Sequence, residues 1–337
     1  MTVRNYFSTV FDGMAKGLFA SLIVGVIIKQ IGEMSGITML VTIGQTAQYL
    51  MGACIGAGVA YVRVAGQFTM FASAVTGMIG AGAISATATD TSAIVYSIAV
   101  GEPVGAFVAA LIGVEIGKLI ESRTKFALLI VPAGVIIAGG LVGLFISPYI
   151  AAFLKEIGTL VNELTLLQPL AMGVLLGLII GMILTSPISS AALCIAININ
   201  GIAAGAALAG CCAQMIGFAV TSFRENKFSG LLSQGIGTSM LQMPNIIKNP
   251  WIWLPPTVAS AVCGGLSTFL FKIETTSVGA GMGTAGLVGQ FATYAVMGSA
   301  SLLPMLILHF IVPIIISVLV SELMRNKSLI KLGDMQL

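Results

Sequence analysis

The sequence predicts an all-α polytopic membrane protein with about ten transmembrane helices and additional re-entrant hairpins. Its 337 residues are 57% hydrophobic and only 8% charged, with a mean hydropathy of +1.06, whereas soluble domains carry roughly a quarter charged residues. Several apolar runs reach the length of about 17–25 residues that a transmembrane helix needs. Apolar and polar residues do not alternate within these runs, and aromatic residues make up only 7% of the chain. A transmembrane β-barrel is therefore disfavoured.

Charge and cysteine content exclude several other classes of function. The formal net charge of +3 is small and scattered, so no nucleic-acid partner is predicted. The five cysteines lie in apolar runs without metal-ligand spacing, so neither a metal nor another cofactor is predicted. Paired acids and a nucleophile beside a base are both missing from the pattern, so no catalytic residue is predicted. The 41 glycines instead favour closely packed helices.

Nine apolar runs are predicted to cross the membrane: residues 17–31, 39–62, 68–84, 104–120, 126–153, 167–184, 201–221, 254–271 and 302–320. Two further segments are ambiguous, because residues 187–199 are short and residues 278–297 are glycine-rich. If Arg224 and Lys227 are to lie on the cytoplasmic side, residues 187–199 must cross in some form, or one neighbouring run must not. Residues 278–297 would then enter and leave on one side. The resulting prediction is ten crossings and one re-entrant segment.

The basic residues predict the orientation of the chain. Arg4 and Lys16 at one end, and Arg325, Lys327 and Lys331 at the other, place both termini in the cytoplasm. The predicted organisation is an N-terminal transmembrane half (1–154), an extracytoplasmic spacer (155–166), a C-terminal transmembrane half with broken helices and hairpins (167–325), and a cytoplasmic tail (326–337). Five crossings in each half would give the halves opposite orientations, so inverted repeats are a hypothesis.

The stretch 185–215 combines polar side chains with helix-breaking residues between two apolar runs. Pro187 and Gly201 interrupt any continuous helix there. Unpaired backbone groups are tolerated in a membrane only where they are packed in protein or line a watery cavity. The stretch is therefore a candidate broken helix of the kind that builds transporter sites.

Two more stretches carry uncharged polar residues at apparent membrane depth. Residues 229–250 predict either a re-entrant hairpin or an amphipathic helix on the membrane surface. Residues 272–290 contain the glycine-rich sequence GAGMGTAG. It lacks the Gly-Lys-Ser/Thr ending of a phosphate-binding loop, and no strand is predicted before it. A hairpin that covers a polyol-like solute is therefore favoured. From the three stretches, the predicted substrate-binding residues are Ser189, Asn198, Asn200, Gln214, Gln234, Gln242, Asn245, Glu274, Thr284 and Gln290.

Ionisable residues are rare within the apolar runs. Glu115 and Lys118 are spaced to form an i,i+3 pair near a helix end. Arg63 is expected to extend along its helix to the membrane interface. His309 is interpreted as a packed, hydrogen-bonded histidine, with a ligand or proton-relay role as the alternative.

Three segments resemble a known family: TSPISSAALCIAININGIAAGAALAGCCAQMIGF at 185–218, SGLLSQGIGTSMLQMPNI at 229–246 and VGAGMGTAGLVGQ at 278–290. They are similar to the enzyme IIC-like membrane proteins of bacterial phosphotransferase systems (PTS), in the branch that includes perfringolysin-regulator-like (PfoR-like) proteins. Glucose-type members of that family carry a GITE-like motif and a histidine that contact sugar. In this chain KIETTS, at 272–277, offers Glu274 in a similar setting.

The resemblance implies a multi-pass permease of the bacterial cytoplasmic membrane, typically a homodimer surrounded by lipid. Such a permease binds a sugar or similar small hydrophilic solute and translocates it, here by alternating access. A separate cytosolic IIB subunit would phosphorylate the delivered sugar, so the chain itself is not expected to be an enzyme. The alternative is a membrane-embedded regulator or sensor of the perfringolysin-regulator type, which would act without transport.

Overall fold

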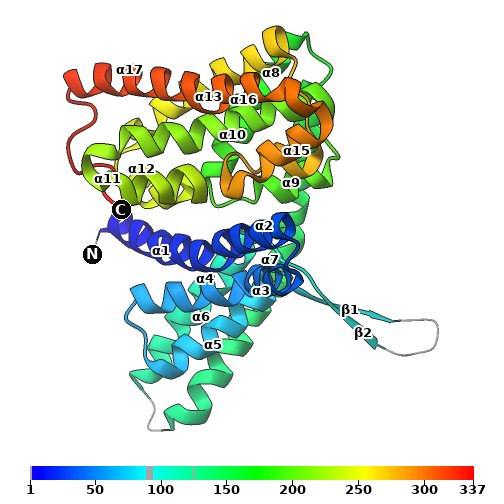
Figure 1. Ribbon diagram of the computed structural model, residues 1–337. Helices are drawn as coiled ribbons and strands as arrows, with labels where there is room; N and C mark the ends of the chain where they lie inside the picture. The colour runs from blue at the N-terminus through cyan, green and yellow to red at the C-terminus, as the bar shows by residue number, and fades with distance from the viewer. Residues whose placement is uncertain (1, 89–93, 124–125) are drawn as a thin grey trace. The chain divides into compact units, whose positions relative to one another are not determined.

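A computed structural model describes residues 2–88, 94–123 and 126–337. The chain forms two compact units, Met1–Phe153 (unit 1) and Leu154–Leu337 (unit 2), and the boundary falls within helix α7. Nearly all regular structure is helical, which confirms the predicted all-α membrane class (Figure 1). Residues 155–164, predicted to be an external spacer, continue helix α7 in the structure.

Unit 1 is built from helices that follow one another closely along the chain. They are α1 (Val3–Leu18), the π-turn η1 (Phe19–Ile23), α2 (Val24–Ser35), α3 (Thr38–Tyr49), α4 (Met51–Val62), α5 (Gln67–Gly80), α6 (Pro103–Glu121) and α7 (Ala127–Leu164). The first three elements form one continuous helix, which ends where Gly36 adopts a left-handed φ of 71°. Glycine takes this conformation without a Cβ clash.

A β-hairpin between α5 and α6 was not predicted from the sequence. Strand β1 (Ile84–Ala88) pairs antiparallel with β2 (Ile94–Ile98), and the side-chain oxygens of Ser85 and Ser97 lie 2.7 Å apart. The apolar run predicted over 68–84 is helical only to Gly80, since Gly82 turns the chain with a φ of 62°. Both strands contain β-branched residues, such as Ile84, Thr87, Ile94 and Val95, which favour extended backbone.

Unit 2 contains long helices separated by short, broken ones. Its elements after α7 are α8 (Pro169–Thr185), α9 (Ser190–Ala196), α10 (Gly201–Thr221), α11 (Phe223–Leu232), η2 (Ser233–Gly237), η3 (Ser239–Gln242), α12 (Met243–Lys248), η4 (Pro250–Trp253), α13 (Leu254–Leu266), η5 (Ser267–Phe271), α14 (Ser277–Ala280), η6 (Ala285–Leu287), α15 (Val288–Met297), η7 (Gly298–Ser301), α16 (Leu302–Leu306), η8 (Ile307–Ile311) and α17 (Val312–Asn326). Helices are interrupted within 185–201, 229–250 and 272–290.

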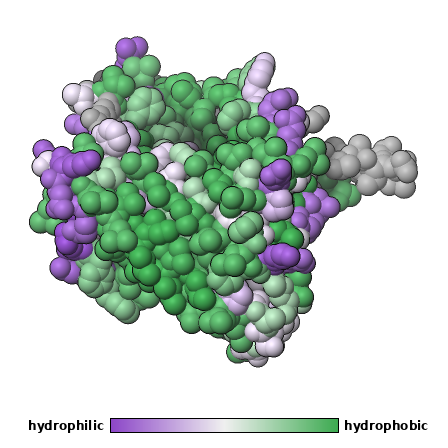
Figure 2. Space-filling model, turned by 90° about the horizontal axis from the view of Figure 1, so that it is seen from above, coloured by the Kyte–Doolittle hydropathy of each residue, from purple (hydrophilic) through white to green (hydrophobic). Residues whose placement is uncertain are grey.

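Several helices in the described residues are long and apolar enough to cross a membrane. Six such segments are Asn5–Ser35, Pro103–Glu121, Ala127–Ile146, Gly201–Thr221, Pro250–Phe271 and Ala285–Asn326, and Met51–Val62 and Pro169–Thr185 are shorter apolar helices. On the face shown in Figure 2, hydrophobic side chains cover a broad area and hydrophilic ones gather towards its edges. The chain is therefore a multi-pass membrane protein. Ten crossings and an inverted repeat stay predictions.

Glycines bring the helices of both units into backbone contact, as the sequence predicts. A Cβ on Gly52 of α4 would lie 2.7 Å from the carbonyl oxygen of Gly77 in α5. In unit 2, a Cβ on Gly177 of α8 would lie 2.6 Å from the carbonyl oxygen of Ser260 in α13. Contacts this close leave no room for any larger side chain.

In unit 1, Glu115 pairs with Arg63 rather than with Lys118 as predicted. Arg63 Nε donates to Glu115 Oε1 at 2.7 Å, and the Tyr6 hydroxyl donates to the same oxygen at 2.8 Å. The Arg63 guanidinium lies over the Tyr6 ring, 4.5 Å from its centre, while Lys118 Nζ donates to the Arg63 carbonyl oxygen. Arg63 is therefore held by side chains of α1 and α6, and the Glu115 carboxylate compensates its charge.

Candidate solute-binding site

The three polar stretches predicted from the sequence meet around α10 in unit 2. The amide N of Gly201 donates to the Thr275 carbonyl oxygen at 3.0 Å, and Thr275 N donates to the Gly201 carbonyl oxygen at 3.3 Å. The side-chain oxygens of Thr185 and Ser239 lie 2.7 Å apart, and Thr284 Oγ1 donates to the Gly235 carbonyl oxygen. Segments far apart in the chain are therefore joined by hydrogen bonds between polar groups.

Local backbone conformation explains why the first break lies between α9 and α10. Asn198 has a φ of 50° and Gly201 a φ of 64°. Both lie in the left-handed region, which asparagine tolerates and glycine adopts freely. The helix cannot continue through these residues, and the backbone groups of Gly201 pair with Thr275 instead.

We define the junction as Asn198, Asn200, Glu274 and Ser277, where this first break meets the segment after η5. Asn200 Nδ2 donates to the Asn198 carbonyl oxygen at 2.8 Å and to Asn198 Oδ1 at 2.9 Å, while Asn200 Oδ1 accepts from Ser277 N at 3.1 Å. The side chains of Asn198, Asn200 and Glu274 are exposed, and Ser277 is half-buried. The junction therefore presents ordered polar groups that retain hydrogen-bonding capacity.

Ser277 of the junction and the neighbouring Thr275 were not among the predicted site residues. Ser277 N orients the Asn200 amide, and Thr275 makes the backbone bridge to Gly201. The sequence signal was the run of hydroxyl residues in KIETTS, but nothing in it specified Asn200 as the partner. Ser189, which was predicted, is half-buried, and its Oγ caps α9 by accepting from Ala192 N at 3.2 Å.

Gln214 is completely buried in α10, and its amide is held by three neighbours. Thr185 Oγ1 and Trp253 Nε1 each donate to Gln214 Oε1 at 3.1 Å, and Gln214 Nε2 donates to Thr257 Oγ1 at 3.2 Å. This amide ties α8, α10 and the start of α13 together. These contacts indicate a structural role for the Gln214 side chain.

Replacing Gln214 by Leu should lower stability without a direct effect on solute contacts. The change leaves the half-buried Trp253 indole N–H without its acceptor, at a cost of about 1–3 kcal/mol, and removes the hydrogen bonds to the Thr185 and Thr257 hydroxyls. We expect a clear drop in the thermal unfolding midpoint of the purified protein in detergent. Gln67→Leu, at an exposed residue, is the matched control. Equal midpoints for both variants would contradict this assignment.

Gln234, Gln242 and Asn245 are buried and form a chain of carboxamides. Gln242 Nε2 donates to Gln234 Oε1, and Asn245 Nδ2 donates to Gln242 Oε1, both at 2.9 Å. Gln234 Nε2 donates to Ser222 Oγ at 2.8 Å. Because these side chains point into unit 2, the alternative of an amphipathic helix on the membrane surface does not fit. Their remaining donors point to residues 335 and 336.

The glycine-rich segment packs against α9 and α10. Ser190 Oγ donates to the Gly281 carbonyl oxygen at 2.7 Å, and Thr284 is fully buried. A Cβ on Gly283 would lie 3.1 Å from the Cys211 carbonyl oxygen. The glycines are therefore used for close packing, which is incompatible with a phosphate-binding loop.

Gln290 and His309 contact each other in the interior of unit 2. Gln290 Nε2 lies 3.2 Å from His309 Nδ1 and 3.3 Å from Cys212 Sγ. His309 is fully buried in the π-turn η8, so the interpretation as a packed, hydrogen-bonded histidine is confirmed. Across the described residues, no group of three or more His, Cys, Asp or Glu side chains is placed to hold a metal ion.

A family model described as "Phosphotransferase system, EIIC" matches residues 8–337. No curated protein matches the sequence. The match covers both units and all three broken segments.

Proposed function

The chain belongs to the phosphotransferase-system EIIC family, and from that premise we propose that it binds a sugar or similar hydrophilic solute at the junction. The EIIC component is the membrane transporter of a sugar phosphotransferase system, and other, cytosolic components carry out phosphorylation. The chain is accordingly a permease component. The solute, alternating access, a IIB partner and a homodimer are parts of the proposal.

The main support for the proposal is that the polar side chains of Asn198, Asn200 and Glu274 are exposed together at the junction. Carboxamides can each donate to and accept from a sugar hydroxyl. A carboxylate such as that of Glu274 accepts hydrogen bonds from two neighbouring hydroxyls, and charged acceptors make the stronger bonds. A neutral polyol pairs with these groups without the cost of burying a second charge.

Broken helices at the junction also support alternating access as the mode of transport. Segments 185–201 and 272–290 meet at the backbone bridge between Gly201 and Thr275 and at two further hydrogen bonds, Ser190 to Gly281 and Ser277 to Asn200, so a movement of one segment against the other would change access to the junction. Transporter sites are commonly built from discontinuous helices of this kind. The residues proposed to contact the substrate are the three exposed residues of the junction, Asn198, Asn200 and Glu274.

Asn200→Ala and Glu274→Gln should each weaken solute binding about tenfold, because each removes hydrogen bonds of roughly 1–1.5 kcal/mol. The measurement is binding of a panel of labelled sugars and polyols to the purified protein. Uptake into proteoliposomes, with and without cytosolic phosphotransferase components, then tests transport. Glu33→Gln, an exposed carboxylate in unit 1 that is 3.8 Å from Lys29, is the matched control.

Unchanged affinity in both junction variants would disprove the location of the site. Binding without uptake under any condition would favour a sensor over a permease. Wild-type uptake that is lost in both variants and retained in Glu33→Gln would support the whole proposal.

A further inference from the structure

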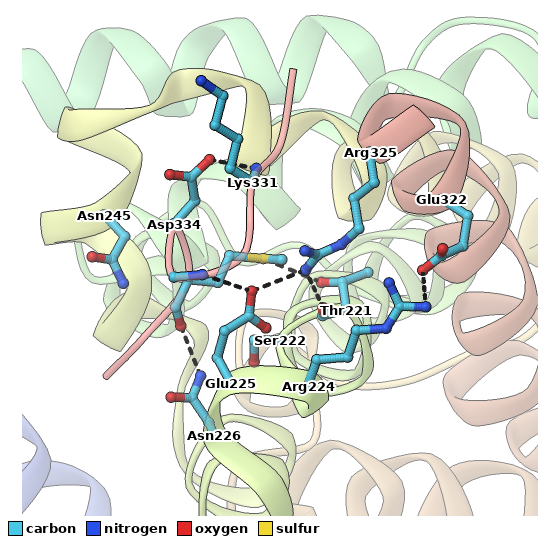
Figure 3. Close-up of polar contacts among 12 residues, drawn as sticks. Thr221, Ser222, Arg224, Glu225, Asn226, Asn245, Glu322, Arg325, Lys331 and Asp334 are labelled. Carbon is cyan, nitrogen blue, oxygen red and sulfur yellow. Dashed lines mark hydrogen bonds and ion pairs between the residues drawn. The ribbon is translucent and has the colours of Figure 1, made fainter. Parts of the chain in front are cut away.

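Residues 327–337, which we call the tail, fold back onto α11 and α12 of unit 2 (Figure 3). Only two tail side chains are fully buried: Ile330 is 2% exposed and Met335 is 0% exposed. They pack in an apolar cluster with Phe218, Ile246, Ile252 and Met324. The intervening Leu332 is 74% exposed. The tail therefore lies on the surface of unit 2 and is fixed there by two buried apolar side chains, Ile330 and Met335, which we call its anchors.

Side-chain carboxamides bind the backbone of the tail. Met335 O accepts from Asn226 Nδ2 at 2.7 Å and from Gln242 Nε2 at 2.9 Å. Asn226 Oδ1 in turn accepts from Leu337 N at 2.9 Å. Two further amides donate to other tail carbonyl oxygens, Asn245 to that of Gln336 at 2.8 Å and Asn249 to that of Leu329 at 2.9 Å.

This arrangement has the chemistry of a peptide-binding site. Carboxamides that donate to carbonyl oxygens and accept from amides recognise an extended backbone, while apolar pockets at fixed spacing select the side chains. The site holds the tail mainly through its backbone and two apolar side chains, while most other tail side chains are exposed. An internal ligand held in this way can dissociate without unfolding the helices beneath it.

The tail-binding amides are connected to the proposed solute site. Gln242, which binds Met335 O, also donates to Gln234 in the π-turn η2. In the same turn, the Gly235 carbonyl oxygen accepts from Thr284 of the glycine-rich segment. That segment begins at Ser277, whose amide binds Asn200. A continuous series of contacts thus runs from the tail to the junction.

We propose that the tail is a releasable latch that restrains segments 222–249 and 277–290 and slows translocation while it is docked. The latch itself is a binding equilibrium between the tail and the carboxamide site. Its effect on translocation depends on the proposed transport function. When the tail leaves, Gln242 and Asn245 lose their backbone acceptors and the restraint on η2 is removed.

The first experiment measures docking and coupling without any transport assay. Met335→Asp places a charge in the apolar anchor and should release the tail, whereas Leu332→Asp puts the same charge at an exposed residue. Hydrogen–deuterium exchange of the full-length proteins is compared over the tail, 222–249 and 277–290. We expect about tenfold faster exchange in all three regions for Met335→Asp only, equivalent to a tenfold shift in local opening.

The second experiment measures initial uptake rates of the same variants in proteoliposomes. Release of the latch should raise the rate by about threefold or more over wild type, with Leu332→Asp unchanged. Ile330→Asp, at the other anchor, should reproduce the effect.

The outcomes separate the latch from the proposed transport function. Wild-type protein that neither binds nor transports any solute would disprove the proposed function, while the exchange data would still decide whether the tail is released. Exchange that is equal in Met335→Asp and Leu332→Asp would overturn the latch. Faster exchange accompanied by slower uptake would also overturn it, since the tail would then be a structural brace.

Discussion

Arg325→Met is expected to destabilise unit 2 by about 3–5 kcal/mol, because it leaves a buried carboxylate without its partner. Arg325 Nη2 lies 3.1 Å from Glu225 Oε1 and also donates to the Thr221 carbonyl oxygen at 3.1 Å (Figure 3). The Arg325 and Glu225 side chains are only 10% and 3% exposed. Thermal unfolding of the purified protein in detergent measures the loss.

An adjacent exposed pair supplies the control for this prediction. Arg224 Nη2 lies 3.1 Å from Glu322 Oε1, but these side chains are 58% and 42% exposed. Exposed pairs contribute about 0–1 kcal/mol, so Arg224→Met should change the unfolding midpoint little. The double variant Glu225→Gln/Arg325→Met should recover part of the stability, because removing both charges avoids an unpaired one. Equal losses for Arg224→Met and Arg325→Met would contradict the assigned difference in burial.

The breaks in unit 2 could be predicted because local sequence causes them. Pro187 and Gly201 interrupt the apolar run between α8 and α10, and the structure places α9 and the left-handed Asn198 there. Helix-breaking residues act within a few positions, so their effect is readable without knowledge of the fold. The membrane class followed in the same way from composition and run length.

Pairings between distant segments could not be predicted. Glu225 and Arg325 are 100 residues apart in the sequence, and no local pattern pairs them. Glu115 likewise pairs with Arg63, 52 residues away, whereas the sequence suggested its neighbour Lys118. A charge shows its partner only after tertiary packing, because the partner need not share its helix.

The candidate site illustrates the same limit. The polar residues of 229–250 were recognised as unusual, but Gln242 and Asn245 turned out to bind the tail. In the sequence the tail reads as a charged cytoplasmic end, since its five apolar residues are interspersed with Lys327, Lys331 and Asp334, and nothing marks Ile330 and Met335 as the two that become buried. Polar side chains at membrane depth indicate that hydrogen-bond partners exist, without specifying whether those partners are solute or protein.

Gly210→Val should destabilise the packing of α8, α10 and α13, at the upper end of the roughly 1–3 kcal/mol that overpacking costs. A Cβ on Gly210 would lie 2.5 Å from Gly177 Cα, so the added atoms meet backbone rather than a movable side chain. On the other side, Ser260 Oγ donates to the Gly210 carbonyl oxygen at 2.9 Å. Separating α8 from α10 would therefore also strain the contact with α13.

The control is Gly140→Val in α7, where the nearest atom to an added Cβ is Ile79 Cδ1 at 3.2 Å. That atom is the end of a flexible side chain and can move. Both substitutions place the same β-branched residue in an apolar helix, so the difference in their thermal unfolding midpoints isolates the backbone contact. We expect a large loss for Gly210→Val and a small change for Gly140→Val. A Gly210→Val protein as stable as the control would mean that α8 and α10 separate readily, and that the three-helix core of unit 2 does not depend on glycine.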